Sequence, residues 1–230
     1  MKAKLIAVAA LASSAAFATH AAVGDENTRL FQDWHYGQNI DDFPRSHGYY
    51  DCSGDLGALA LCYDNVTFVG YQFQGQLFFS DENTLVSVSI VSDYSDDLYA
   101  TLVGTLVRNY GMIFSEGPND TLDLVEKVRQ GAYRDEEAFE LAMNRFESEQ
   151  MRQGYFGMTL VEVDAIERLL PESSNAQALL MKLQPGARAI EVIAYEDDLW
   201  GASLGASFYL PAQQIGRMED QIRQAPVEDF

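Results

Sequence analysis

The sequence has few basic residues, and this shortage limits the partners that it can bind. Its 230 residues include 15 Lys and Arg against 35 Asp and Glu, which gives a formal net charge of −20. Phosphate recognition relies on clustered Lys and Arg, so the composition argues against a nucleic acid partner. A basic protein partner fits this charge, although solubility or adaptation to salty surroundings explains it more simply.

Recognisable catalytic and metal-binding patterns are also missing. Histidine occurs three times, and His35 and His47 are 12 residues apart without HxxxH or HExxH spacing. No GxSxG elbow and no phosphate-binding loop is present. Carboxylates are so common that an acid pair at any chosen spacing carries little information. We therefore predict no catalytic residue, no metal site and no cofactor.

Long apolar runs are absent beyond the first residues, which have the pattern of a secretory signal peptide. Lys2 and Lys4 precede the apolar residues 5–17, and small residues follow at positions suited to cleavage. Cleavage is expected after Ala21, with Ala18 as the alternative. No cysteine stands at the cleavage site, so a lipid anchor is not expected. No later stretch approaches 18 uninterrupted apolar residues, so a membrane span is not expected either. The mature protein is predicted to be soluble and periplasmic or secreted.

Cysteine occurs only twice, at Cys52 and Cys62. A pair of this kind in an exported protein usually forms a disulfide. The spacing differs from the CxxC of thioredoxin-like redox sites. A structural disulfide that closes a loop of 11 residues is therefore predicted.

Apolar periodicity predicts an α+β fold of two similar units, each an antiparallel sheet packed with helices. The first unit is residues 22–118, the second is residues 152–230, and residues 119–151 form a helical connector. Similar landmarks recur at offsets of 120, 118 and 117 residues, namely Gly37 and Gly157, Ile90 and Phe208, and Leu98 and Ile215.

Local signals assign several shorter elements. Asn39 is placed to cap a short helix that runs through Phe43, and Thr159 and Glu162 have the spacing of a capping box for a helix reaching residue 170. Residues 112–118 are expected to form a loop, and residues 178–183 a strand.

The stretches "YGQNIDDF" and "FGMTLVEV" resemble the Gly-x-Thr/Ser-x-x-acid-Val helix start of small exported domains. These include the β-lactamase-inhibitor proteins, which carry two tandem copies, and the small lipoproteins of outer-membrane assembly. The resemblance covers about eight residues in each half and the order of elements, and it implies helices on one face of an antiparallel sheet with binding as the usual role. This chain departs from it in lacking a lipid-attachment cysteine, in pairing cysteines in one half only, and in having the connector. No functional residue is carried over.

Aromatic residues near the cysteines are the candidates for recognition. Trp34, Tyr36, Tyr49 and Tyr50 belong to types that often anchor interfaces, although the same rings would also plug the edge of the first core. The sequence thus predicts a non-catalytic periplasmic protein that binds another protein, as an enzyme inhibitor or an envelope accessory factor. The alternatives are a carboxylate-dependent hydrolase and a carrier of a small apolar ligand.

Overall fold

A computed structural model describes residues 28–197 and 201–224, with backbone only for residues 136, 197 and 218–224. The predicted signal peptide, residues 1–21, lies outside the described residues. None of the described helices combines the length and apolar composition needed to cross a bilayer.

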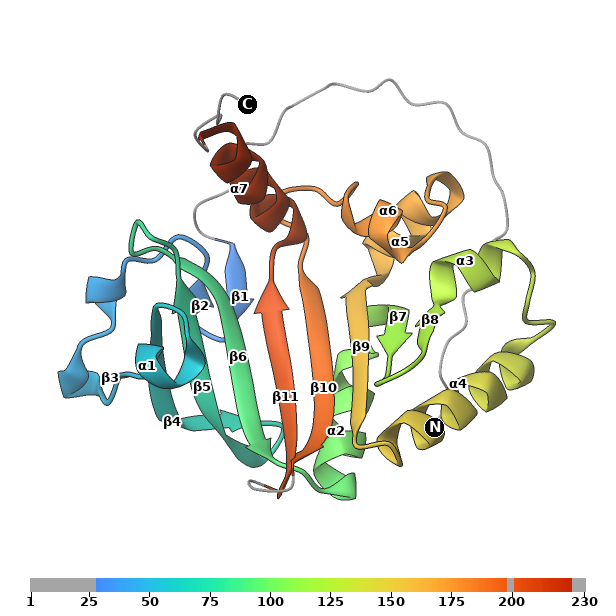
Figure 1. Cartoon of the computed structure of the whole chain (residues 1–230), viewed down its shortest axis with the longest axis horizontal. Helices are drawn as coiled ribbons and strands as arrows, with labels where there is room; N and C mark the ends of the chain where they lie inside the picture. The colour runs from blue at the N-terminus through green and yellow to red at the C-terminus, as the bar shows by residue number, and fades with distance from the viewer. Residues whose placement is uncertain (1–27, 198–200, 225–230) are drawn as a thin grey trace, which may run out of the picture.

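One antiparallel sheet of nine strands organises the described residues (Figure 1). The first and last strands along the sheet, β3 and β8, are short. In spatial order the strands are β3 (Tyr50–Asp51), β4 (Ala60–Phe68), β5 (Tyr71–Phe79), β6 (Leu85–Asp93), β11 (Gly201–Tyr209), β10 (Ala189–Asp197), β9 (Tyr155–Glu162), β7 (Tyr110–Glu116) and β8 (Thr121–Asp123). A separate pair is formed by β1 (Arg29–Phe31) and β2 (Trp34–His35).

Helices connect and cover these strands. The longer ones are α2 (Asp96–Leu106), α4 (Glu136–Met151) and α7 (Pro211–Gln224). The shorter ones are η1 (Ile40–Asp42), η2 (Arg45–His47), α1 (Ser53–Leu56), α3 (Leu124–Arg129), α5 (Val163–Leu169), η3 (Leu170–Glu172) and α6 (Ala176–Leu180).

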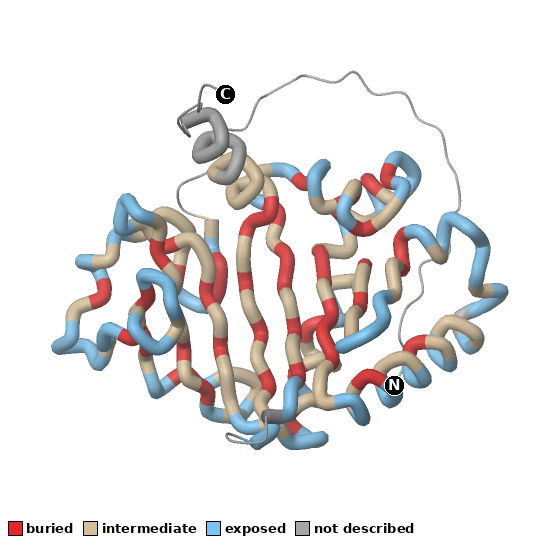
Figure 2. The backbone as a smooth tube through the Cα atoms, viewed as in Figure 1, coloured by how far each residue is buried: buried red, intermediate tan, exposed pale blue. Residues whose placement is uncertain are grey.

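Apolar residues alternate along the central strands, so that one face of the sheet is buried (Figure 2). Ile90 of β6 and Phe208 of β11 lie on this face, against Leu98 and Leu102 of α2 and Phe31 of β1. A smaller cluster, in which α5 and α6 pack on β9 and β10, covers one end of the opposite face. None of the described helices covers the middle of that opposite face (Figure 1).

The α+β class and its antiparallel sheet are confirmed, but the sheet is continuous rather than divided in two. It includes strands from all three predicted segments, because β8 lies within residues 119–151.

Several local predictions are wrong in the second half. Residues 155–162 form β9 rather than the start of a helix, so Thr159 lies within a strand, and α5 begins after Glu162 without a side-chain cap. The "FGMTLVEV" stretch that carried half of the family resemblance is therefore mostly strand. Residues 112–118 are mainly strand β7, and residues 176–180 form α6, capped by Asn175.

In the first half the local signal agrees with the structure. Asn39 accepts a hydrogen bond from Asp41 N at 3.0 Å, and Asp42 accepts one from Asn39 N at 3.1 Å, which completes a capping box. The two stretches differ in their tertiary surroundings, because η1 is a turn at the surface, whereas β9 pairs with β10 on one side and β7 on the other. Sheet pairing overrides helix signals in β9.

Candidate functional site

The four predicted aromatic residues divide between the core and the surface. Trp34 is 7% exposed, and its Nε1 donates a hydrogen bond to Tyr49 Oη at 3.0 Å. Tyr49 is half-buried and stacks on Tyr63 with 5.0 Å between ring centroids. Tyr36 is half-buried beneath the guanidinium of Arg217, 6.0 Å away. Tyr50, at 37%, is the most exposed of the four.

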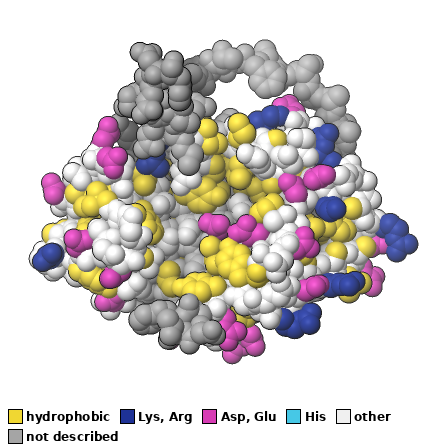
Figure 3. Space-filling model, in the orientation of Figure 1, with side chains coloured by type: hydrophobic (Ala, Val, Ile, Leu, Met, Phe, Trp, Pro, Cys, Tyr) yellow, Lys and Arg dark blue, Asp and Glu magenta, His cyan; other side chains and the backbone are white. Residues whose placement is uncertain are grey.

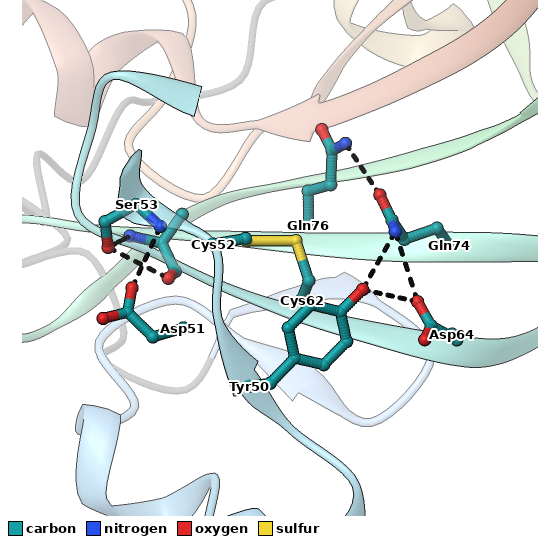
Figure 4. The surroundings of a disulfide bond; sticks show 9 residues. Tyr50, Asp51, Cys52, Ser53, Cys62, Asp64, Gln74 and Gln76 are labelled. Carbon is teal, nitrogen blue, oxygen red and sulfur yellow. Dashed lines mark hydrogen bonds between the residues drawn. A yellow bond between two sulfur atoms is a disulfide. The ribbon is translucent and has the colours of Figure 1, made fainter. Parts of the chain in front are cut away.

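The predicted disulfide joins Cys52 to Cys62, with their Cα atoms 5.8 Å apart. It links the start of α1 to β4, beside strand β3 (Figure 4). Tyr50 lies next to it, so that this ring projects from a cross-linked edge of the sheet.

A chain of hydrogen bonds leads from Tyr50 across the neighbouring strands (Figure 4). Tyr50 Oη donates to Asp64 Oδ1 at 2.7 Å, and this bond raises the pKa of the tyrosine. Gln74 Nε2 donates to Tyr50 Oη at 3.0 Å and to Asp64 Oδ1 at 3.2 Å. Gln76 Nε2 in turn donates to Gln74 Oε1 at 3.2 Å. Polar contacts thus connect the cross-linked edge to β5.

The strand register extends this polar surface across the sheet, because directly paired residues point to the same face. One row runs from β5 to β9 through Gln76, Ser89, Ser207, Glu191 and Thr159. At its centre the Oγ atoms of Ser89 and Ser207 are 2.7 Å apart. We call the uncovered surface around this row the open face.

Two neighbouring carboxylates, those of Glu191 and Glu116, lie on the part of the open face near β9. Glu191 of β10 is half-buried, and burial followed by the charge of Glu116 raises its pKa. Glu116 of β7 accepts a hydrogen bond from Tyr155 Oη at 2.6 Å. Gly157 provides the room, since a Cβ there would lie 3.0 Å from Glu116 Cγ. Figure 3 shows acidic side chains near the middle of this face.

Neither carboxylate has a basic partner within the part of the chain that the structure describes. The one ion pair found there joins Arg188 and Glu162 at 3.2 Å. Since a partly buried carboxylate is costly without a compensating charge, Glu116 and Glu191 are together suited to receive a cation.

Two tyrosines complete the acidic group. Burial and then the charge of Glu191 raise the pKa of Tyr209 to about 12. Burial, the hydrogen bond to Glu116 and the charges of Glu116 and Glu191 raise the pKa of Tyr155. Both hydroxyls therefore remain protonated at neutral pH. The Tyr155 hydroxyl donates its hydrogen to Glu116, and the Tyr209 hydroxyl can donate to a ligand.

Sequence reasoning missed these four residues. The local sequence predicts a loop at Glu116 and a helix start at Tyr155, and these predictions do not place the two side chains on a shared face. The sequence does contain a signal for Glu191, because a carboxylate within the apolar stretch "AIEVIAY" is unusual for a strand that pairs on both sides.

Neither metal ligation nor known relatives define the site further. Within residues 28–197 and 201–224, no group of three or more His, Cys, Asp or Glu is placed to hold a metal ion. No family model, curated protein or solved structure matches this chain.

Proposed function

We propose that this is an exported, non-catalytic binding protein whose open face receives basic groups of another protein. The observation that carries the proposal is the pair of carboxylates, Glu116 and Glu191, held close together on the sheet without a basic partner among the described residues. A lysine or arginine from a partner would supply the missing charge.

The surroundings of the pair suit an extended basic segment. Ser89 and Ser207 present hydroxyls beside Glu191, and Gln74 and Gln76 present amides further along the face. These groups can bond to peptide N–H and C=O groups, while the net charge of −20 steers a basic partner towards the protein.

The intramolecular disulfide fits an oxidising compartment. Together with the signal-like residues 1–21, it supports export to the periplasm or beyond. An envelope accessory factor and an enzyme inhibitor both agree with such a location.

Two similar units, as expected from the sequence, also form part of the proposal. Hairpin β5–β6 leads into α2, and hairpin β10–β11 leads into α7, with β6 and β11 paired antiparallel between them. Ser89 and Ser207 are direct partners and are 118 residues apart, the offset that also separates Ile90 from Phe208. A pseudo-twofold axis at this pair would account for the arrangement.

A defined basic probe tests the binding site. We expect a lysine-rich hexapeptide to bind the oxidised protein in isothermal calorimetry, with affinity that falls as salt rises. Replacing both Glu116→Gln and Glu191→Gln should weaken binding at least tenfold. Glu167→Gln, an exposed substitution on α5, is the matched control and should leave affinity unchanged.

Equal affinities of the wild-type protein and the double variant would refute the site. If the double variant binds more weakly, capture of partners from a bacterial envelope extract, with that variant as the control, identifies the natural ligand among the proteins that only the wild-type retains.

The hydrolase alternative has one supporting observation. A carboxyl group whose pKa is raised, close to a second carboxylate, is the composition of an acid–base pair. Turnover of a glycan or ester substrate that disappears in Glu191→Gln would favour hydrolysis over binding.

A further inference from the structure

An apolar cavity lies at the β7–β8 end of the sheet, between β7, α3, α5 and the segment that leads into α4. Its volume is about 280 Å³. Ile113, Leu124 and Val125, all buried, contribute to its lining. Phe139 of α4 forms part of the wall, and Val128, which is 48% exposed, lies where a ligand would enter.

The rim of this cavity carries a basic side chain that has no partner among the side chains that the structure describes. Arg134 is exposed and makes no hydrogen bond or ion pair with any described residue. Its neighbour Asp135 is engaged, because Oδ1 accepts a hydrogen bond from Ala138 N at 2.9 Å as the N-cap of α4. Tyr133 is held against Phe139 in an edge-to-face contact at 5.2 Å. The Arg134 guanidinium is thus a charged group at the rim that is available to bind a ligand.

We propose that this cavity binds a small amphiphilic carboxylate, with its aliphatic chain inside and its head group at Arg134. At roughly 30 Å³ for each non-hydrogen atom, the figure for liquid water, the cavity holds about nine atoms, the size of an eight-carbon chain. The lining supplies no buried charge for a polar tail, whereas an arginine suits a carboxylate. The start of α4 adds a favourable dipole for the same charge.

Octanoate is the probe, and the full oxidised protein is the sample. In calorimetry we expect octanoate to bind, acetate to show no binding because it lacks the chain, and octylamine to bind at least tenfold more weakly because its head group is cationic. Glu191→Gln should not change octanoate binding, so the outcome is independent of the function proposed for the open face.

Two substitutions locate the ligand. Val128→Phe, at an exposed position, should fill the mouth and weaken octanoate binding at least tenfold. Arg134→Gln should weaken octanoate by about fivefold to tenfold and leave 1-octanol unchanged. Circular dichroism melts of both variants should match the wild-type, which separates a filled site from a damaged fold.

Leu141→Phe is the matched control, because Leu141 is 70% exposed and lines a different hollow on α4. It should leave octanoate binding unchanged. The proposal is overturned if octanoate does not bind, if it binds Val128→Phe as it binds the wild-type, if octylamine binds as tightly as octanoate, or if Leu141→Phe is the variant that weakens binding.

Discussion

Trp34 and Gly75 form a close contact that a pair of substitutions tests. A Cβ added to Gly75 would lie 2.6 Å from Trp34 Cη2 and 2.9 Å from Val66 Cγ2. The ring has little freedom to move aside, because it is 7% exposed and is hydrogen-bonded to Tyr49. We expect Gly75→Ala to lower the free energy of unfolding by about 1–3 kcal/mol, the usual cost of overpacking.

A double-mutant cycle isolates this contact. Trp34→Phe removes the outer ring that reaches Gly75 and the indole N–H that bonds to Tyr49, at a cost of about 2 kcal/mol. In that background Gly75→Ala should cost less, because only the Val66 contact remains. The expected coupling is about 1–2 kcal/mol, measured by urea unfolding of the four oxidised proteins with circular dichroism.

Additivity within about 0.5 kcal/mol would refute the placement of the ring against Gly75. If Trp34→Phe also leaves stability unchanged, the ring lies at the surface. Trp34 would then be available as the binding residue that the sequence predicts.

Three further predictions concern stability. Reduction of the Cys52–Cys62 bond should lower the melting temperature by about 5–10 °C, because its 11-residue loop contributes about 2.8 kcal/mol in the chain-entropy model; an unchanged melting temperature would contradict this. Glu191→Gln should stabilise the protein at pH 7.5 but not near pH 4. The pKa of Glu191 is raised in the folded protein, so the wild-type loses stability as the pH rises above about 4.5, the ordinary pKa of the carboxyl group. Parallel stability profiles of the wild-type and the variant from pH 4 to 7.5 would contradict this prediction. Gly117→Ala should lower the free energy of unfolding by about 1–3 kcal/mol, because its Cβ would overlap the buried Gln150 side chain. An unchanged midpoint in thermal melts would contradict this prediction.

The capping signals show how far local sequence could predict this fold. Asn39 and Asp42 cap a surface turn, and both capping hydrogen bonds join residues no more than three positions apart, so the local pattern is sufficient to predict them. Thr159 and Glu162 have the same spacing, but they lie in or beside a strand that is paired on both sides. Spacing of this kind carries no information about distant partners, and so the prediction failed where long-range pairing decided the structure.

The aromatic candidates show the corresponding limit for the site. Composition indicated that Trp34 and Tyr50 belong to interface-forming types, but it did not indicate which side of the sheet each ring occupies. The register answers that question, because Gly75 receives Trp34 on the buried face while Gln74, one residue earlier, bonds to Tyr50 on the other. A difference of one residue in a strand reverses the face.

The residues on the two faces of the sheet differ in their effect on stability, and Glu191 shows this difference most clearly. On the buried face the core cluster that includes Ile90 and Phe208 is apolar, and packing alone explains the choice of its residues. On the open face the carboxylate of Glu191 raises the free energy of the folded protein, because burial and the charge of Glu116 oppose its charged form and raise its pKa. A glutamine at position 191 would keep the shape and avoid that penalty. Residues that reduce stability without a packing role are typical of functional sites, so a gain in stability by Glu191→Gln together with loss of the basic ligand would identify the open face as a binding site.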